Sequence, residues 1–412
     1  MSEGKYSKNG IIALCSLVYF VSYFSRKGFA AVMAGMLQEA VLDKPTAGLV
    51  GTMLFVFYGA GQLLSGYLGD KIRPQHLLCL GLTVTSLCNL LMPLLPSSSL
   101  MIPVWGLNGL AQAMLWPPIV KILSGYLDHE RYVMANLIVT SAAHVATILL
   151  YVFVPICLKY YSWETVFYVA SALALISMLV FAVALRFVIP REAELPVSPK
   201  ISTEEQGSAS MGKAFISSGI IPILGCIIMC GFLRDGIESW LPTLYSEAFS
   251  RDSSESVLVS VVLPIFSILT VSLVTALHKK PLFNNETDGT MILFGVGIVL
   301  SVPLSLMIEA ESVAARVICL ILAALVCAAM HGVNFLLISC LPGRFAALGR
   351  ASTVGGLVNS FVYIGAAIST YGIALIADNL GWRATVISWA GVALAGLLLS
   401  LLARKKYTLF IK

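Results

Sequence analysis

Long apolar segments of bilayer-spanning length recur along the whole chain. An α-helix needs about 20 predominantly apolar residues to cross a hydrocarbon core of about 30 Å. Because an unpaired backbone polar group is costly in lipid, such segments fold as transmembrane helices. Twelve of them are predicted, at 11–37, 48–69, 76–95, 99–125, 133–158, 164–187, 216–241, 256–277, 290–308, 314–341, 351–376 and 383–403.

The composition agrees with a membrane protein. The 412 residues are 58% hydrophobic and only 11% charged, whereas a soluble domain carries about 25% charged residues. The lipid bilayer is therefore the main solvent, and the net charge of +5 gives no reason to expect a nucleic-acid partner. The nine cysteines lie scattered in apolar segments without a C-x-x-C pair or a Cys/His cluster, so no metal site and no cofactor are predicted.

One polar segment interrupts the series of apolar ones. Residues 189–213 are rich in Pro, Ser and charge, which is typical of a flexible linker. The predicted fold is an all-α membrane protein with twelve transmembrane helices in two pseudo-symmetric six-helix bundles. The first bundle comprises residues 1–188, the cytoplasmic linker follows at 189–213, and the second bundle comprises 214–412.

The distribution of Lys and Arg predicts the orientation of the chain. Cytoplasmic loops carry an excess of these residues. If the N-terminus is inside, the outer segments hold only Lys44, Lys159, Arg251, Arg316 and Arg383, and the other flanking cations fall inside. The sequence therefore predicts a multi-pass protein of the bacterial inner membrane with both termini in the cytoplasm. The segment after the polar N-terminus is expected to be a retained helix and not a signal peptide.

The two halves repeat, and each carries an arginine at an equivalent depth. Residues 131–163 are echoed by 350–382 at equal spacing, and Arg26 corresponds to Arg234. A charged side chain at the bilayer centre costs at least about 2.5–3.5 kcal/mol. Because two planar guanidinium groups match phosphate or carboxylate oxygens, we expect them to form a mid-membrane site for a divalent oxyanion. The alternative is a pair of structural arginines neutralised by carboxylates.

Embedded acids are scarce. Only Asp235 and Glu238 lie inside a predicted span, and Glu238 can either neutralise Arg234 or reach across to Lys27. Because three embedded cations outnumber two acids, we expect a positively charged cavity whose excess charge a bound anion would neutralise. The scarcity of carboxylates argues against a proton-driven symporter. His144 and His331 keep this alternative open, since a free histidine side chain titrates near neutral pH.

Several motifs then resemble the organophosphate:phosphate antiporter family of the major facilitator superfamily, the group of the glycerol-3-phosphate and hexose-phosphate transporters. "GYLGDKIRP" resembles the superfamily loop between helices two and three. "YFSRKGFA", "LNGLAQAMLWPP" and "FLRDGIESWLPTLY" are similar to family motifs on helices one, four and seven. His144 stands where the family places a histidine near the substrate.

The resemblance implies exchange of a phosphorylated metabolite or related organic anion for inorganic phosphate by rocker-switch alternating access. Arg26 and Arg234 would grip the phosphoryl group, Lys27 would pair with Glu238 across the halves, and His144 would contact substrate. The cavity-lining aromatic residues would be Tyr23, Tyr58, Trp116 and Tyr363, for each of which packing or interfacial anchoring is the alternative. The gating residues would include Asp235 and the loop residues Asp70, Lys71 and Arg73.

The chain departs from the family pattern at several positions. Gln62 replaces a lysine that many members carry, and the predicted span 256–277 lacks the matching glutamate. Other departures are expected to face the organic part of the substrate: Ala113, Leu115, Gly231 and His331. The alternative for His331 is an ordinary packing residue. The sequence does not identify the organic part of the substrate.

Two rival functions remain open. One is a proton-coupled transporter of another organic anion or drug in the same superfamily, and the other is a transporter-like membrane sensor of sugar phosphate. An enzyme is not predicted, since no nucleophile–base pair, phosphate-cradling loop or metal-ligand cluster is recognised. The expected partners are a phosphorylated small molecule, inorganic phosphate and the lipid bilayer, and a monomer suffices.

Overall fold

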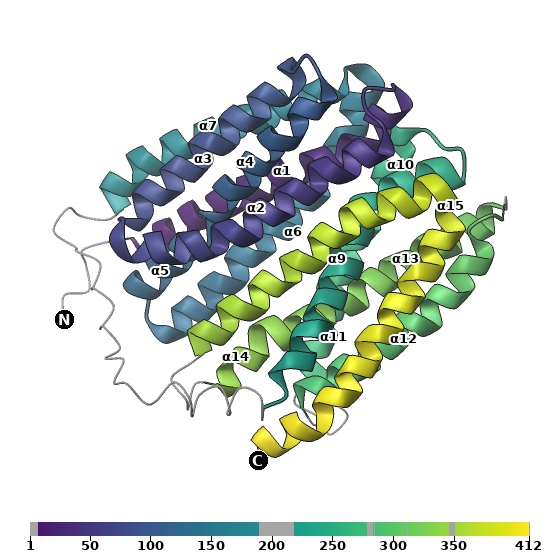
Figure 1. Cartoon of the computed structure of the whole chain (residues 1–412). Coiled ribbons are helices and arrows are strands. Elements are labelled where there is room, and N and C mark those ends of the chain that lie inside the picture. Colours follow the sequence, from purple (N-terminus) through teal and green to yellow (C-terminus); the bar gives the residue numbers. More distant parts are fainter. Residues whose placement is uncertain are drawn as a thin grey trace.

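A computed structural model describes residues 7–188, 218–277, 283, 285–310, 312–345 and 351–411. Nearly all of these residues are helical, and no strand occurs among them (Figure 1). The predicted linker 189–213 lies outside the described residues, so the proposed domain boundaries stay a prediction. Figure 1 shows α1 to α7 on one side of the molecule and α9 to α15 on the other, with the start of α1 and the end of α15 at the same end of the helices.

The first half consists of long helices with one break. Its elements are α1 (Lys8–Gln38), α2 (Lys44–Lys71), α3 (Pro74–Leu91), η1 (Met92–Leu94), η2 (Ser98–Leu100), α4 (Met101–Ala113), α5 (Trp116–Tyr126), α6 (His129–Tyr160) and α7 (Trp163–Val188). The break falls at Met114 and Leu115, because the following Trp-Pro-Pro sequence suits the first turn of a new helix. The predicted span 99–125 is therefore two helices.

The second half contains further breaks. Its elements are α9 (Ile220–Ala248), α10 (Ser253–Val259), α11 (Val262–Leu277), α12 (Glu286–Met307), α13 (Val313–Asn334), η3 (Phe335–Cys340), α14 (Leu341–Arg344) and α15 (Ala351–Ile411). Gly381 has φ of 80°, which kinks α15 between the last two predicted spans. The segment η3 is a π-helix that directly continues α13.

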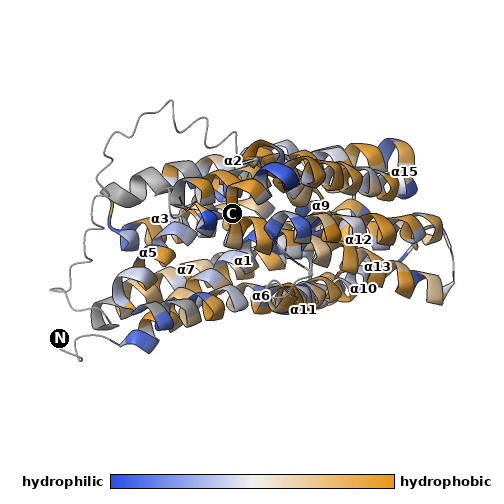
Figure 2. Ribbon diagram, turned by 90° about the horizontal axis from the view of Figure 1, so that it is seen from below, coloured by the Kyte–Doolittle hydropathy of each residue, from blue (hydrophilic) through white to orange (hydrophobic). Residues whose placement is uncertain are grey.

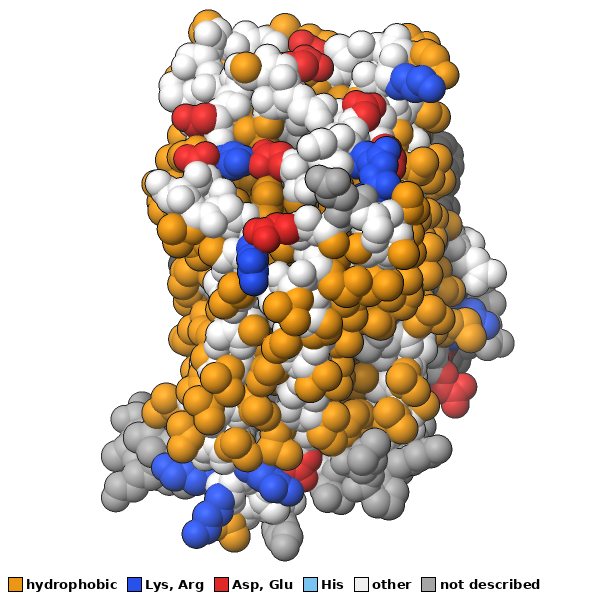
Figure 3. All heavy atoms as spheres, turned by 90° about the vertical axis from the view of Figure 1, so that its right-hand side faces the viewer, with side chains coloured by type: hydrophobic (Ala, Val, Ile, Leu, Met, Phe, Trp, Pro, Cys, Tyr) orange, Lys and Arg blue, Asp and Glu red, His pale blue; other side chains and the backbone are white. Residues whose placement is uncertain are grey.

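Helix length and composition support a membrane-embedded protein. Within the described ranges, 9 stretches are long and apolar enough to cross a bilayer, and the last of them, 354–411, contains the kink at Gly381. Apolar residues predominate along the helices in Figure 2. Figure 3 shows a belt of apolar side chains on one face, with charged side chains gathered toward the two ends. Each of the twelve predicted spans coincides with helical residues, although the count of crossings itself stays a prediction.

Capping residues fix the starts of several helices. Ser7 accepts a hydrogen bond from the backbone N–H of Gly10 at the start of α1, and Asp128 accepts one from that of Arg131 at the start of α6. Lys8 also lies 3.1 Å from the Asp128 carboxylate. The Arg131 N–H and the Lys8 side chain together lower the pKa of Asp128.

Glycines allow close helix contact inside the second half. A Cβ atom added at Gly231 on α9 would collide with the carbonyl oxygen of Val362 on α15, and one added at Gly365 would collide with that of Ile228. A helix backbone can approach this closely only where the residue facing it is a glycine without a Cβ atom. This pair of glycines therefore fixes α9 against α15, and with it the positions of the polar residues further along α9.

The two halves are joined near the ends of α1 and α9. Lys44 pairs with Glu247 at 2.8 Å, and Thr52 lies 2.8 Å from Thr370, the two hydroxyl oxygens being in hydrogen-bonding contact. Gln38 donates to Ser246 at 2.7 Å. We call this set of contacts the closed end, defined by Gln38, Lys44, Thr52, Ser246, Glu247 and Thr370. Between described residues, the hydrogen bonds joining the halves lie at the closed end or around Glu238.

Candidate substrate-binding site

A cavity of about 320 Å³ lies between the two halves. Most of the residues that the sequence analysis assigned to substrate or gate line this one cavity. They are Tyr23, Arg26, Lys27, Tyr58, Trp116, His144, Arg234, Asp235, Glu238, His331 and Tyr363. Helices α1, α2, α5 and α6 of the first half and α9, α13 and α15 of the second half therefore meet around a common space.

Arg26 projects from the middle of α1 into an aromatic environment. Its guanidinium carbon lies 4.3 Å from the ring centroid of Tyr23 and 5.1 Å from that of Tyr58. The Tyr58 ring in turn packs against Tyr363 of the second half, with centroids 4.4 Å apart. Among the described residues, Arg26 has no carboxylate partner. Aromatic faces attract a cation without cancelling its charge, so Arg26 keeps its charge and its edge donors for an anion.

Arg234 is held by its sequence neighbour. Its Nη2 lies 2.7 Å from Asp235 Oδ2 and its Nε 3.3 Å from Asp235 Oδ1, so both carboxylate oxygens accept from one guanidinium edge. Its Nη1 donates to Asn334 on α13. The sequence analysis considered Glu238 as the neutralising residue for Arg234, but Asp235 takes that role in the structure.

Glu238 joins the two halves of the protein. Its Oε2 accepts from Lys27 Nζ at 2.5 Å across the interface, as the sequence suggested, while its Oε1 lies 2.9 Å from His331 Nε2. The Lys27 and Glu238 side chains are only 17% and 13% exposed, so this pair is shielded from water. Tyr151 on α6 adds a hydrogen bond to the Glu238 carbonyl oxygen. Lys27 and Glu238 are thus satisfied in this conformation.

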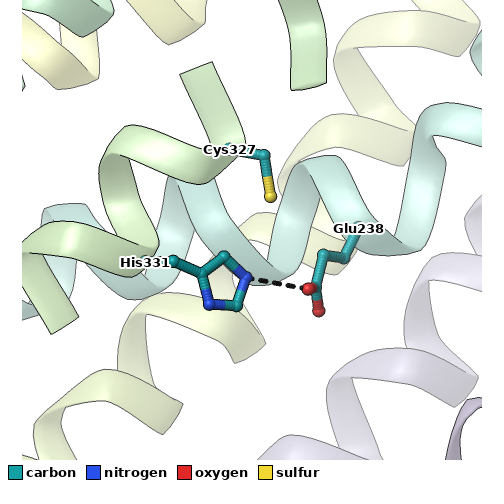
Figure 4. Close-up of side chains that lie close together, drawn as sticks. All are labelled: Glu238, Cys327 and His331. Carbon is teal, nitrogen blue, oxygen red and sulfur yellow. Dashed lines mark hydrogen bonds and ion pairs between the residues drawn. The ribbon is translucent and has the colours of Figure 1, made fainter. Parts of the chain in front are cut away.

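A Cys/His cluster adjoins Glu238, which corrects the sequence analysis. Cys327 and His331 are four residues apart on α13, and their ligand-capable atoms lie within 4.8 Å of each other and of Glu238 (Figure 4). The helical spacing of Cys327 and His331 was visible in the sequence, but their proximity to α9 was not. Each of the three already has a protein partner, since Cys327 Sγ donates to the Arg234 carbonyl oxygen and Glu238 binds Lys27 and His331.

Two helix irregularities bring further residues to the cavity. The break between α4 and α5 places Trp116 at the cavity wall, where its ring centroid lies 4.7 Å from the ring centroid of Tyr19. The π-helix η3 begins directly after Asn334, and both Asn334 and Ile338 line the cavity. π-Helical turns often occur at functional sites. His144 on α6 lines the cavity as well, and its Nδ1 lies 3.1 Å from the Thr140 carbonyl oxygen.

Several predicted positions do not line the cavity. Gln62 on α2 lies outside its lining, and so do Ala113, Leu115 and Gly231, which were expected to face the organic part of the substrate. Ala113 and Leu115 are buried among helices, and Gly231 packs against α15. Ala113 packs against Gly61, Leu115 packs against Gly81, and Gly231 packs against Val362, so these residues serve helix packing and not substrate contact.

The predicted gating loop is described only in part. Asp70 and Lys71 belong to the last turn of α2, but their side chains lie outside the described residues. Arg73 is exposed at the N-cap of α3, away from the cavity lining. The role of this loop stays a prediction.

Comparison with known sequences identifies the superfamily. The sequence profile of the Major Facilitator Superfamily matches residues 15–370, which includes helices of both halves. The chain belongs to the Major Facilitator Superfamily. This membership agrees with the fold predicted from the apolar segments, and it identifies the chain as a member of a transporter superfamily and not an enzyme.

Relatives within the Major Facilitator Superfamily have names that refer to phosphorylated sugars or glycerol. A probable hexose phosphate transport protein of Chlamydia trachomatis serovar D is 28% identical over 203 residues, 49% of this chain and 44% of that protein. The glycerol-3-phosphate transporter of Bacillus subtilis is 25% identical over 252 residues, 56% of each chain. The membrane sensor protein UhpC of Escherichia coli K12 is 22% identical over 415 residues, 97% of this chain and 93% of that protein. The chain spans less than half the length of the Chlamydia relatives that it matches.

Solved structures of several transporters have the same fold as this chain. A bacterial homolog of the human lysosomal transporter Spinster, in an inward-facing and occupied conformation, superposes with a TM-score of 0.77 at 13% identity. It covers 100% of this chain, and the chain covers 99% of it. The nucleoside transporter NupG, as a D323A mutant, gives a TM-score of 0.74 at 12% identity, with 96% and 100% coverage. At such low identities these likenesses show the fold alone.

A second polar cluster, around Glu286 and Asp288, was not predicted from the sequence. Glu286, at the start of α12 and 1% exposed, accepts from Arg344 at 2.8 Å and from the Tyr407 hydroxyl at 2.8 Å. Asp288 pairs with Arg404 at 2.6 Å. These acids lie at the start of α12, outside the predicted span 290–308. The sequence signal that could have found them is the segment "NNETDG", which begins a helix opposite several cations.

Proposed function

We propose that this protein is a secondary transporter that exchanges a phosphorylated metabolite or related organic anion for inorganic phosphate. The observation that carries the proposal is that Arg26 and Arg234, one from each half, line the same cavity together with the cross-half pair of Lys27 and Glu238. Transporters built from repeats bind substrate at the repeat interface near mid-membrane. The names of the relatives support the phosphorylated class of substrate.

The mechanism that we propose is rocker-switch alternating access. In this conformation the halves touch at the closed end, where Lys44 pairs with Glu247 and Thr52 contacts Thr370. We infer that the cavity opens toward the other end, where α1 begins and α15 ends, and that this end is cytoplasmic as the distribution of Lys and Arg predicts. Switching requires the contacts at the closed end and the Lys27–Glu238 pair to separate while new contacts form at the opposite end.

The charge on Arg26 explains why such a carrier would exchange anions. The sequence predicted a site in which Arg26 and Arg234 both bind the anion, but Asp235 pairs with Arg234 in the structure, so the uncompensated charge resides on Arg26. Enclosing an uncompensated charge in a low-dielectric space is costly. A bound anion removes this cost, so the loaded carrier reorients faster than the empty one. Obligatory exchange follows from that difference.

The experiment that tests the proposal is uptake of labelled phosphate into proteoliposomes that contain the purified full-length chain. Vesicles preloaded with phosphate should accumulate label, and a panel of unlabelled organophosphates outside should compete. Uptake that collapses with a protonophore and ignores phosphate competitors would instead assign the chain to the proton-coupled transporters. Vesicles without protein provide the background.

A membrane sensor of sugar phosphate is the second candidate function. It is favoured by one observation, namely that the similarity to the sensor UhpC extends over 97% of this chain, whereas the matches to transport proteins cover about half. A sensor would bind a sugar phosphate in the same cavity without sustained flux. Binding of phosphate or organophosphate to the purified chain, combined with no uptake above background, would favour the sensor.

A further inference from the structure

With the lining histidines His144 and His331 counted as neutral, the charged residues of the cavity leave an excess of one positive charge. Three cations line it, Arg26, Lys27 and Arg234, and two carboxylates, Asp235 and Glu238. Lys27 pairs with Glu238 and Arg234 pairs with Asp235, which leaves Arg26 as the cation without a carboxylate among the described lining residues. A bound anion with one negative charge would therefore make the cavity electrically neutral.

The guanidinium group of Arg234 is not free to bind an anion through two parallel hydrogen bonds. Asp235 occupies the guanidinium edge formed by Nε and Nη2, through both of its oxygens, and Asn334 occupies Nη1. The Arg234 and Asp235 side chains are only 12% and 11% exposed. A second bidentate partner would have to displace the Asp235 carboxylate and leave it buried without a counter-charge, which is strongly unfavourable.

Arg26 differs from Arg234 in the partners around its guanidinium group. Neutral aromatic rings of Tyr23 and Tyr58 face it, and the aromatic wall continues across the interface to Tyr363. The edge donors of a stacked guanidinium group remain available for an oxyanion. An anion bound there would place its organic part against aromatic rings.

From this arrangement we propose that the Arg234–Asp235 pair sets the charge of the substrate, so that the site selects oxyanions with a single negative charge anchored on Arg26. The inference rests on the proposed function and narrows its substrate class to singly charged forms, such as a protonated phosphate monoester. Asp235 acts as a specificity-determining residue, because it cancels the charge that a doubly charged anion would need. The sequence motif alone suggested the opposite, a divalent oxyanion held by two free arginines.

Two tetrahedral anions of fixed charge provide the test. Dimethyl phosphate carries one negative charge and sulfate carries two throughout the neutral pH range. Their affinities for the purified full-length chain are measured by isothermal titration calorimetry. The wild-type chain should bind dimethyl phosphate at least about tenfold more tightly than sulfate, since an unbalanced charge in a cavity of low dielectric constant is costly. Equal affinities, or tighter binding of sulfate, would overturn the proposal.

The variant Asp235→Asn separates charge selection from general anion binding. It preserves the shape of the side chain and frees Arg234, so sulfate affinity should rise at least about tenfold relative to dimethyl phosphate. The matched control is Glu309→Gln, which removes the same charge from an exposed ion pair with Arg383 outside the cavity. The control should leave the ratio of affinities unchanged. An unchanged ratio in Asp235→Asn would contradict the assignment of Asp235.

A wild-type measurement protects the test against a variant that does not fold. Methyl phosphate loses its second proton with a pKa of about 6, so its affinity should fall as the pH rises from about 5 to about 8. Dimethyl phosphate does not titrate in this range and therefore reports any effect of His144 or His331. A methyl phosphate affinity that rises with pH relative to dimethyl phosphate would refute the proposal. If the wild-type chain selects singly charged anions but does not exchange phosphate in proteoliposomes, only the antiporter assignment is refuted.

Discussion

At the residue scale, the site depends on how each cation is satisfied. Arg26 is stacked between tyrosines, Lys27 is paired across the interface, and Arg234 is paired within its own helix. The sequence predicted that these three residues would share one cavity, because repeat equivalence places them at similar depths. The family resemblance implied the pair of Lys27 and Glu238, but Asp235 was not identified as the partner of Arg234, since that choice depends on side-chain directions that spacing along a helix leaves open.

Arg26→Lys should lose most of the transport activity. A lysine keeps the charge but lacks the planar fork and the stacking surface that face Tyr23 and Tyr58. We expect labelled phosphate uptake in proteoliposomes to fall at least about tenfold, the effect of about 1.4 kcal/mol lost from anion binding. The matched control is Arg131→Lys, at an exposed position beside Asp128, which should transport normally. Full activity of Arg26→Lys would remove Arg26 from the site.

The Lys27–Glu238 pair should show strong energetic coupling. A double-mutant cycle with Lys27→Met and Glu238→Gln, measured by thermal unfolding in detergent, should give a coupling free energy of about 1–3 kcal/mol. The shielded pair keeps its attraction, whereas an exposed pair is screened by water. The exposed pair of Arg383 and Glu309 is the control, with an expected coupling of about 0.2–1 kcal/mol. Similar coupling free energies for the two pairs would show that the Lys27–Glu238 pair does not hold the two halves together.

At the element scale, helix breaks and close helix contacts position the site. The Trp-Pro-Pro sequence predicted Trp116 near the cavity, and the structure shows that it does so by ending one helix and starting another. The break between α10 and α11 lies just before Pro264, and η3 ends just before Pro342 and Gly343, so prolines follow both irregularities, but their positions do not show which hydrogen bonds change. Apolar periodicity identifies a span but does not show where its hydrogen-bond pattern changes.

Gly231→Ala should destabilise the protein by about 1–3 kcal/mol, the usual cost of overpacking. The added methyl group would collide with the Val362 carbonyl and push α9 away from α15, and with it Arg234 and Glu238. The apparent melting temperature of the purified protein is the measurement. Gly391→Ala is the control, because a Cβ atom there meets no other atom within 4 Å. Equal melting temperatures for the two variants would show that this contact is less tight than the structure indicates.

At the scale of the whole molecule, two packed halves enclose one polar cavity in an apolar exterior. The composition and the twelve apolar segments were sufficient to predict an all-α membrane protein, because lipid allows few alternatives, and the family resemblance added the transporter fold. The conformation, closed at one end, was not predictable, since one sequence serves every state of an alternating-access cycle. Two residues of the closed end, Thr52 and Thr370, have no charge or motif that would identify them in advance.

Locking the closed end should stop transport reversibly. The hydroxyl oxygens of Thr52 and Thr370 are 2.8 Å apart, so Thr52→Cys with Thr370→Cys, in a variant without native cysteines, should form a disulfide under mild oxidation. Phosphate uptake should fall to background and return after reduction. The single-cysteine variants, treated in the same way, should remain active. Undiminished uptake in the cross-linked protein would contradict alternating access through this end.

The central claim is that an anion bound at Arg26 allows the two halves to switch. Its most direct test is efflux of labelled phosphate from proteoliposomes, measured with and without unlabelled phosphate or organophosphate outside. The account predicts slow efflux into anion-free buffer and an acceleration of at least about tenfold when a counter-anion is added, because the empty carrier must enclose an uncompensated charge. Equally rapid efflux in both buffers would contradict it.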